Sequence, residues 1–256
     1  MQIFIIFHKT IYEECYKNIP DELIRKYFTF YAVNESVPKQ YLTNEKYKYL
    51  NEWELPIYDA SFQKKGYNEN SALYHIHRNH IHEKYKYIGF FQYDMVFKPE
   101  FVKILQQIEN DVQAESSAPL KDLNRNKYYP LQMYSFNFIS KGWIPKNRDV
   151  LNDIIQSYET HFKVKFGHRG NLERYYPLYN SYIVPSSVYE TVMNWVIQLY
   201  DIIYPKVIPV PLPSNVGHIG GIFERVMGLG LGEQPIEAIE LHSYISHEDK
   251  LKRLSY

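Results

Sequence analysis

The sequence predicts an α/β domain in which a mostly parallel central sheet is flanked by helices. Short apolar runs rich in aromatic and β-branched residues are typical of buried strands in parallel sheets. In this chain such runs alternate with segments of helical periodicity, as they do in βαβ units. With 256 residues, the chain is long enough for one large α/β domain or two small ones with a sizeable core, and it shows no repeat and no clear domain boundary.

The first half of the chain supplies most of the predicted strands. These strands are QIFIIF (2–7), FTFYAV (28–33), LPIYDA (55–60) and the run at 86–91. One helix is predicted over 69–83, where neither Pro nor Gly interrupts the chain, and another over 99–109. The second helix carries an apolar stripe at helical spacing, and Pro99 suits its first turn.

The second half is predicted to contain a loop, a strand region and a helix before its long C-terminal segments. Residues 111–128 are polar and lack periodicity, so they are expected to form a surface loop. A strand region is expected at 129–139 and a helix over 150–161.

Two more helices are predicted toward the C-terminus. Ser187 and Glu190 have the spacing of a capping box ahead of an apolar stripe, which predicts a long helix. The following PKVIPVPLP is expected to be extended, because proline fixes φ. The segment HIGGIFERVMGLGLGEQ is expected to form a short helix that breaks at Gly228, Gly230 and Gly232.

Composition argues against several classes of protein. Lys plus Arg and Asp plus Glu both number 29, so the net charge is zero, which argues against a nucleic-acid partner. The single cysteine, Cys15, excludes an intramolecular disulfide and fits a reducing compartment. The apolar start is too short for a signal peptide, and no run approaches the roughly 18 apolar residues of a membrane span. We therefore expect a cytoplasmic protein without a membrane span; the sequence does not predict its oligomeric state.

The stretch HIHRNHIHEKYKYIGFFQYDM contains a conspicuous histidine cluster. On one continuous helix, His75 and His82 share a face, while His77 and His80 point away from it. No pair has the i, i+4 spacing that places two imidazoles on one metal ion. The histidines are therefore expected on a solvated or half-buried helix, with a metal site that combines one of them with distant ligands as the alternative.

Asp94 lies at the end of the same stretch, directly after a predicted buried strand. In open α/β sheets, ligands bind beyond the carboxyl ends of the strands, so a carboxylate there is placed to meet a ligand or a metal ion. The alternative is that Asp94 only turns the chain or caps the next helix. The residues alone leave both interpretations open.

Several blocks, in this order along the chain, carry a resemblance to a known family. They are IFIIFHK, YNENSALYHIHRN, KYIGFFQYDMVF, and YNSYIVPSSVYETVMNWV followed by GGIFERVMGLGL. Together the blocks span most of the chain. They resemble GT-A-type glycosyltransferases that build capsular and lipopolysaccharide chains, in particular a sparsely characterised family of that kind.

The resemblance implies a single GT-A (Rossmann-like) domain over 1–256, with a nucleotide-sugar-binding half (1–97) and an acceptor-binding half (129–256). It implies an inverting hexosyl or pentosyl transferase for polysaccharide biosynthesis. Such an enzyme moves a sugar from a UDP- or GDP-linked donor to a hydroxyl of a glycan or lipid-linked acceptor. GT-A enzymes commonly carry Asp-x-Asp at the end of a central strand, where this chain has Gln92-Tyr93-Asp94 and keeps only the last Asp.

The resemblance also implies roles for individual residues. Asp94 is expected to hold Mn²⁺ or Mg²⁺, with Gln92 beside it and His218 or His242 as a later ligand. The alternatives are a structural turn for His218 and a core position for His242. Glu224 is expected near the start of a late helix, as the base that deprotonates the acceptor, or else as a first-turn carboxylate that stabilises the helix dipole.

The remaining candidates would bind the donor. Arg225 is expected to bind phosphate or acceptor, or to be a surface residue. The polar residues expected near the base and ribose, or else in ordinary loops, are His8, Lys9, Asn34 and Glu69. Two other classes stay open: a sugar- or nucleotide-binding module without turnover, and a nucleotide-sugar hydrolase.

Overall fold

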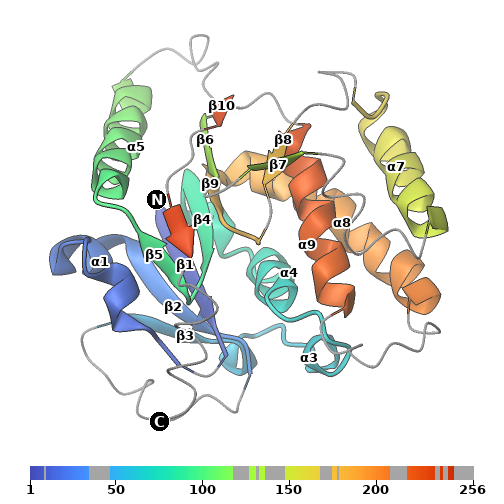
Figure 1. The fold of residues 1–256 in the computed structure, drawn as a ribbon, viewed down its shortest axis with the longest axis horizontal. Helices are drawn as coiled ribbons and strands as arrows, with labels where there is room; N and C mark the ends of the chain where they lie inside the picture. Colours follow the sequence, from blue (N-terminus) through green and yellow to red (C-terminus); the bar gives the residue numbers. More distant parts are fainter. Residues whose placement is uncertain are drawn as a thin grey trace.

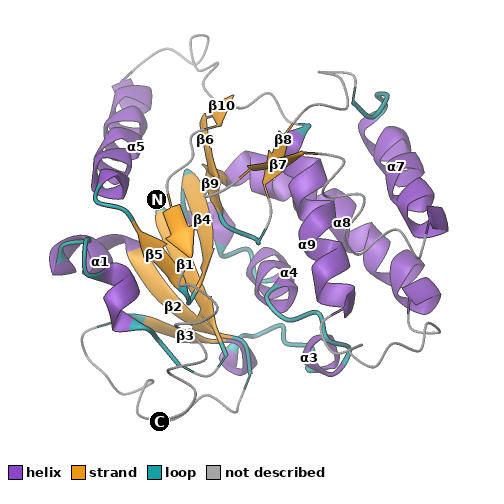
Figure 2. Ribbon diagram, in the orientation of Figure 1, coloured by secondary structure: helices purple, strands orange, loops and turns teal. Residues whose placement is uncertain are grey.

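The computed structural model confirms the predicted α/β architecture, with a central sheet between two layers of helices (Figures 1 and 2). It describes residues 1–8, 10–34, 47–117, 127–130, 133–135, 148–167, 175–177, 179–207, 218–233, 237–238 and 242–244.

The main sheet has seven strands in the order β10-β6-β9-β4-β1-β2-β3. The strands are β1 (Gln2–Phe7), β2 (Phe28–Ala32), β3 (Tyr49–Asn51), β4 (Tyr87–Gln92), β6 (Lys127–Pro130), β9 (Tyr182–Pro185) and β10 (Glu237–Ala238). Neighbours are parallel except where β9 pairs with β4 and β6. Two smaller antiparallel pairs join β5 (Met95–Phe97) to β11 (His242–Tyr244) and β7 (Met133–Ser135) to β8 (Tyr175–Pro177).

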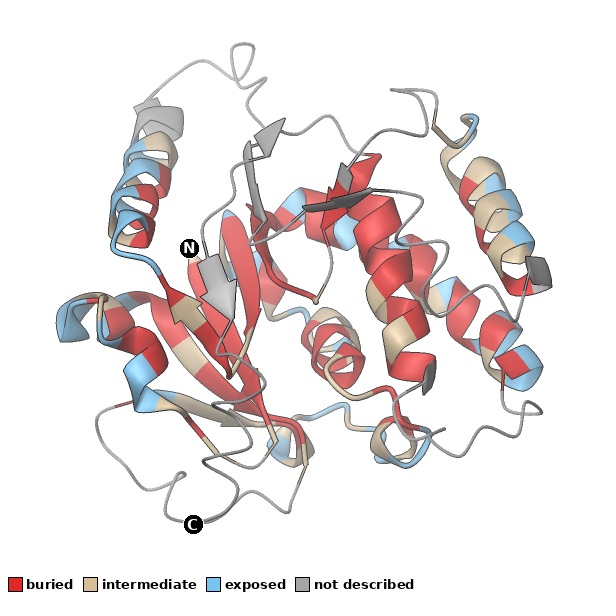
Figure 3. Cartoon of the chain, viewed as in Figure 1, coloured by how far each residue is buried: buried red, intermediate tan, exposed pale blue. Residues whose placement is uncertain are grey.

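Strand β1 shows why an uninterrupted apolar run forms the centre of this sheet. Successive side chains of a strand point to opposite faces. Phe4 and Ile6 belong to one hydrophobic cluster, whereas Ile3, Ile5 and Phe7 belong to the other. Helices cover both faces, so each face needs apolar side chains, and the strand is buried throughout (Figure 3).

The helices divide between these two clusters. Those packed on the cluster around Phe4 are α4 (Asn70–Arg78), α7 (Arg148–Phe162), α8 (Ser186–Val207) and α9 (His218–Gly232). Those on the other cluster are α1 (Asp21–Tyr27) and α5 (Glu100–Ser117). The described part of the chain also contains the short helical turns η1 (Glu13–Tyr16), η2 (Glu52–Glu54), α3 (Ser61–Lys64) and η3 (His82–Lys84). Of the helices described, none has the length and hydropathy needed to cross a membrane.

The prediction of a strand at 55–60 was wrong. This segment forms turns, and the third strand is β3 instead. Its backbone is held by helix α4: the Asn79 side chain bonds both the N–H and the C=O of Ile57. The Asp59 N–H donates to Nε2 of His75 at 2.9 Å. The segment therefore packs against helix α4 and is not a strand of the sheet.

The loop predicted at 111–128 begins too early. Helix α5 continues to Ser117, because Val112 still packs against the cluster on its face of the sheet. The end of that predicted loop is strand β6, and residues 118–126 lie outside the described ones. The strand region predicted at 129–139 contains the end of β6 and all of β7, and residues 136–139 are likewise outside.

Helix α9 continues through Gly228 and Gly230, contrary to the prediction, and ends at Gly232, as predicted. A Cβ on Gly230 would lie 2.7 Å from Val192, and one on Gly232 would lie 2.0 Å from Tyr176. These glycines therefore permit close packing against α8 and β8. Helix α8 begins at Ser186, so Ser187 lies inside its first turn. It continues through Pro205, where an extended segment was expected.

Candidate active site

The carboxyl ends of β1, β2 and β4 form one edge of the sheet. From β1 the chain proceeds to β2 and β3 on one side, and returns as β4 on the other side. Such a reversal of strand order creates a crevice in which α/β proteins bind ligands. A cavity of about 210 Å³ lies at this edge. Its lining residues are Ile6, Phe7, His8, Val33, Asn34, Gln63, Asn68 and Glu69.

The cavity brings together three of the residues predicted to bind the donor, namely His8, Asn34 and Glu69. Gln92 ends strand β4 and pairs in register with Ile6, so its backbone lies beside the cavity wall. Lys9 lies outside the described residues. Sequence reasoning found His8, Asn34 and Gln92 because they lie where buried strands end, and Glu69 because it directly precedes helix α4.

A set of half-buried aromatic side chains lies at the same strand ends. The rings of Tyr12 and Tyr93 stack with centroids 5.6 Å apart, and the ring of His8 meets Tyr93 edge-on at 5.0 Å. Backbone bonding fixes this arrangement, because the Tyr93 N–H donates to the carbonyl of Ile6. Aromatic faces of this kind stack on bases and sugars. Sequence reasoning did not single out Tyr12 and Tyr93, because a high tyrosine content does not show which rings meet.

Asp94 occupies the turn between β4 and β5, where it is 3% exposed. Its charge reaches the cavity: burial raises the pKa of Glu69, and the carboxylate of Asp94 raises it further. Burial and then the charge of Asp94 also raise the pKa of Tyr93. Asp94 therefore interacts electrostatically with two residues of this region, Glu69 and Tyr93.

Glu224 lies in the second turn of α9, later in the helix than expected, because α9 already begins at His218. Its Oε1 accepts a hydrogen bond from the Tyr179 N–H at 2.9 Å. Burial raises the pKa of this carboxyl to about 7, and the nearby charge of Glu69 acts in the same direction. A carboxyl that titrates near neutral pH is suited to general acid–base catalysis.

A strained turn at 179–181 contacts Glu224 and the sequence neighbours of Glu69 and Asp94. Tyr179 and Asn180 have φ values of 61° and 44°, a left-handed conformation that is costly for residues other than glycine. Tyr179 holds Glu224, and Asn180 donates to the side chain of Asn70, the neighbour of Glu69. Ser181 Oγ lies 3.0 Å from the sulfur of Met95, the neighbour of Asp94. Backbone strain of this kind clusters at functional sites.

The start of helix α9 packs directly on the loop that lines the cavity. The Gly220 N–H donates to the carbonyl of Gly66 at 3.2 Å, and the Asn70 side chain donates to the carbonyl of Gly220 at 2.9 Å. A Cβ on Gly220 would lie 3.0 Å from the carbonyl oxygens of Gly66 and Tyr67. Only glycine permits this approach, which positions Asn68 and Glu69 relative to Glu224.

The other predicted site residues are Arg225, His218 and His242. For the two histidines, the structure describes only the backbone. Arg225 is buried, and its Nη1 donates to the carbonyl of Gly221 in the preceding turn, so it is not a surface residue. His218 begins α9. His242 pairs with Phe97, at the end of β5 that is remote from Asp94. At about 3.4 Å per residue, roughly 10 Å of strand separates the backbones of His242 and Asp94.

The chemistry of these residues fits a hard divalent cation. Mg²⁺ is usually held by one or two carboxylates together with substrate phosphates, rather than by a complete protein cage. Asp94 supplies such a carboxylate, and its field already extends to Glu69. Among the described side chains, these carboxylates are not part of any group of three ligand atoms within 4.8 Å, so phosphate oxygens would have to complete the shell.

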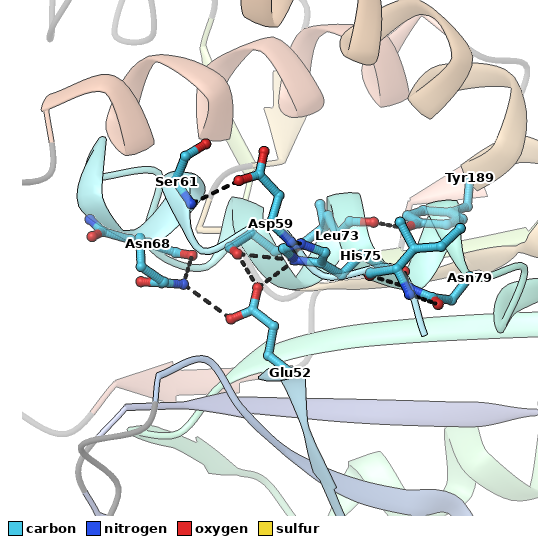
Figure 4. Close-up of polar contacts among 11 residues, drawn as sticks. Glu52, Asp59, Ser61, Asn68, Leu73, His75, Asn79 and Tyr189 are labelled. Carbon is cyan, nitrogen blue, oxygen red and sulfur yellow. Dashed lines mark hydrogen bonds and ion pairs between the residues drawn. The ribbon is translucent and has the colours of Figure 1, made fainter. Parts of the chain in front are cut away.

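A buried polar network is centred on Glu52 and His75 (Figure 4) and reaches the cavity through Gln63. Glu52 and His75 are both fully buried, and Oε1 of Glu52 lies 2.6 Å from Nδ1 of His75. The Ser71 hydroxyl also bonds Glu52. The other oxygen of Glu52 accepts from Gln63, a cavity-lining side chain, at 3.3 Å. The expectation that His75 is a solvated or half-buried helix residue was therefore wrong.

The predicted facing of the other histidines was also wrong. Helix α4 ends at Arg78, and His80 has a φ of 55°, so the chain turns before His82. The rings of His77 and His82 then stack 5.1 Å apart at an interplanar angle of 5°. The prediction assumed one continuous helix, and it was wrong because helix α4 does not extend to His82.

Comparison with known proteins gives similarities to solved structures but none at the level of sequence. No family model and no curated protein matches the sequence. The fold is similar to the apo structure of WbbM, a bifunctional glycosyltransferase, with a TM-score of 0.59 and 14% identity. The match covers 96% of this chain and 45% of that chain, so this chain spans about half the length of its structural neighbour. The likeness shows a glycosyltransferase-like, Rossmann-type fold.

Proposed function

We propose that this chain is a glycosyltransferase that moves a sugar from a nucleotide-diphosphate sugar to a hydroxyl of a glycan or lipid-linked acceptor. One observation carries the proposal. The strained turn at 179–181 bonds Glu224, a half-buried carboxyl with a pKa of about 7, and contacts Met95, which directly follows the buried Asp94 at the end of a central strand. The structural neighbour supports it at the level of the fold.

On the donor side, the nucleotide would occupy the cavity lined by His8, Asn34 and Glu69. The ring of Tyr93 or Tyr12 offers a face for the base or ribose. Asp94 would hold Mn²⁺ or Mg²⁺, which when bound neutralises the charge of the departing diphosphate. These residues would hold the donor in one orientation, which lowers the entropic barrier to reaction.

On the acceptor side, Glu224 would act as the general base. Its carboxylate takes the proton of the acceptor hydroxyl, whose oxygen then forms a bond to the anomeric carbon. The bond from that carbon to the diphosphate oxygen breaks, and the diphosphate leaves with the electron pair. Attack opposite the leaving group inverts the anomeric centre, which is part of the proposal. Arg225, adjacent in sequence but buried, would position α9 rather than touch phosphate.

A thermal-shift titration with UDP and GDP, with and without Mn²⁺, tests the proposal. Ligand at 100 times its dissociation constant stabilises the folded protein by about 2.7 kcal/mol. Asn34→Ala should lose the shift, whereas Asn194→Ala, an exposed change on α8, should keep it. The absence of a shift with every nucleoside diphosphate would exclude a donor site. Donor cleavage without any acceptor would indicate a hydrolase, and binding without turnover would indicate a binding module.

A further inference from the structure

A second group of metal-ligating side chains lies at the opposite end of the parallel strands. The turn η3, which contains His82 and Glu83, precedes β4, whereas Asp94 follows that strand. Glu190 lies in the first turns of α8, whose first residue, Ser186, bonds the carbonyl of Lys86 just before β4. Strand β4 has six residues, so roughly 20 Å separates this group from the proposed sugar-transfer site.

The geometry of the group is that of an incomplete coordination sphere. One ligand atom each from His82, Glu83 and Glu190 lies within 4.8 Å of the other two, and no other trio in the described part of the chain does this. His82 is only 1% exposed, and neither of its ring nitrogens has a hydrogen-bond partner of good geometry. Leaving a buried polar group unsatisfied is costly, which points to a missing ligand.

The ring of His82 is fixed in place. His77 stacks on one side of it, parallel to within 5° at 5.1 Å, and Tyr189 packs against it at 5.3 Å with an interplanar angle of 66°. Tyr189 is itself held, because its hydroxyl donates to the carbonyl of Leu73. A ligand whose rotamer is set by packing loses little freedom when it binds.

We propose that His82, Glu83 and Glu190 bind a divalent transition-metal ion, with Zn²⁺ as the best match. One imidazole nitrogen and two carboxylates suit Zn²⁺, and the negative charges balance the ion. Three protein ligands leave a fourth position for water. Both carboxylates are exposed, and one oxygen of Glu83 contacts His80 at 2.6 Å. The ion would link η3 to α8.

The test is a titration of metal-free protein with Zn²⁺ by calorimetry and with Co²⁺ by visible absorption. It is run in the Asp94→Asn background, so that the proposed donor-side ion does not contribute. We expect one equivalent per chain and a tetrahedral Co²⁺ spectrum. Glu190→Gln and His82→Asn should each weaken binding at least tenfold. The matched control Glu22→Gln, an exposed change on α1, should leave the affinity unchanged.

A further variant separates this site from ordinary surface binding. His80 is exposed and contacts Glu83, so ions held by that surface pair would be lost in His80→Ala. The proposed site should bind as tightly, or more tightly, in His80→Ala. Glu190 is exposed, so Glu190→Gln should fold normally, which its unfolding midpoint without metal checks. Substoichiometric binding, or wild-type affinity in Glu190→Gln, would overturn the proposal.

Discussion

Glu224 and Tyr179 form a contact that opposes the effect of burial. The Tyr179 N–H donates to Glu224 at 2.9 Å and favours the ionised carboxylate, whereas burial and the charge of Glu69 favour the protonated form. Burial prevails, and the pKa of Glu224 rises to about 7. A carboxyl balanced in this way can accept a proton at neutral pH and return it.

Replacing this carboxyl should slow transfer without affecting donor binding. Glu224→Gln keeps the shape and can still accept from Tyr179, but it removes the base. We expect transfer to slow by roughly 10²- to 10⁴-fold, with unchanged nucleotide affinity and no inflection near pH 7 in the rate profile. Transfer assays across pH, with calorimetry for the nucleotide, provide the measurement. A variant with wild-type rates would remove Glu224 from the mechanism.

The same substitution should change how stability depends on pH. The pKa of Glu224 in the folded protein lies above its ordinary value, so its contribution to stability is present at low pH and is lost as pH rises from 4.5 to about 7. Relative to Glu224→Gln, the wild type should lose roughly 1–3 kcal/mol of unfolding free energy over this interval. Urea unfolding of both proteins at pH 4.5 and pH 8 measures the difference. Parallel pH profiles would contradict the prediction.

Asp94 should act on the donor rather than the acceptor. Asp94→Asn removes the charge that a complex of divalent cation and diphosphate requires, so donor affinity should fall and its dependence on Mn²⁺ should weaken. Asp201→Asn, at an exposed position on α8, serves as the matched control. Isothermal titration of nucleotide with and without Mn²⁺ gives both quantities. If Asp94→Asn binds like the wild type, Asp94 is a turn residue only.

Gly220 should be needed for ligand binding as well as packing. In Gly220→Ala, the new Cβ meets backbone oxygens of Gly66 and Tyr67, so α9 and the cavity loop must separate. We expect a loss of about 1–3 kcal/mol in stability and weaker nucleotide binding. Gly230→Ala clashes with Val192 and Trp195, far from the cavity, and should lower stability while leaving affinity intact. Equal affinities in the two variants would disprove the role of Gly220.

The pair of His75 and Glu52 should be essential for stability. His75→Ala would leave the buried Glu52 with its bonds to Ser71 and Gln63 but without the imidazole, and breaking a buried ion pair typically costs about 3–5 kcal/mol. His80→Ala removes an exposed histidine from the same stretch and should change stability by less than about 0.5 kcal/mol. Urea unfolding compares the two variants. Similar losses would mean that the buried network contributes little.

The central strands could be predicted from the sequence because they are buried on both faces. Such strands are nearly continuous runs of apolar residues, which can be recognised in the sequence. The polar residues that follow them, such as His8 and Asn34, could be found for the same reason. The turn at Tyr179 could not, because it matters only through Asn70 and Glu224, which are distant in sequence. Gly228 and Gly230 were wrongly predicted to break α9, and the role of Gly230 depends on its contact with α8, which the sequence does not place.

Strand β9 also determines how the chain can be divided. It lies between β4 and β6 and pairs with both in the antiparallel direction. A fragment that ends after α5 would leave the backbone groups of β4 unpaired along an apolar edge, which favours association with other chains and aggregation. Limited proteolysis in the region between α5 and β9 should therefore yield two pieces that remain together. Neither piece should stay in solution when it is expressed by itself.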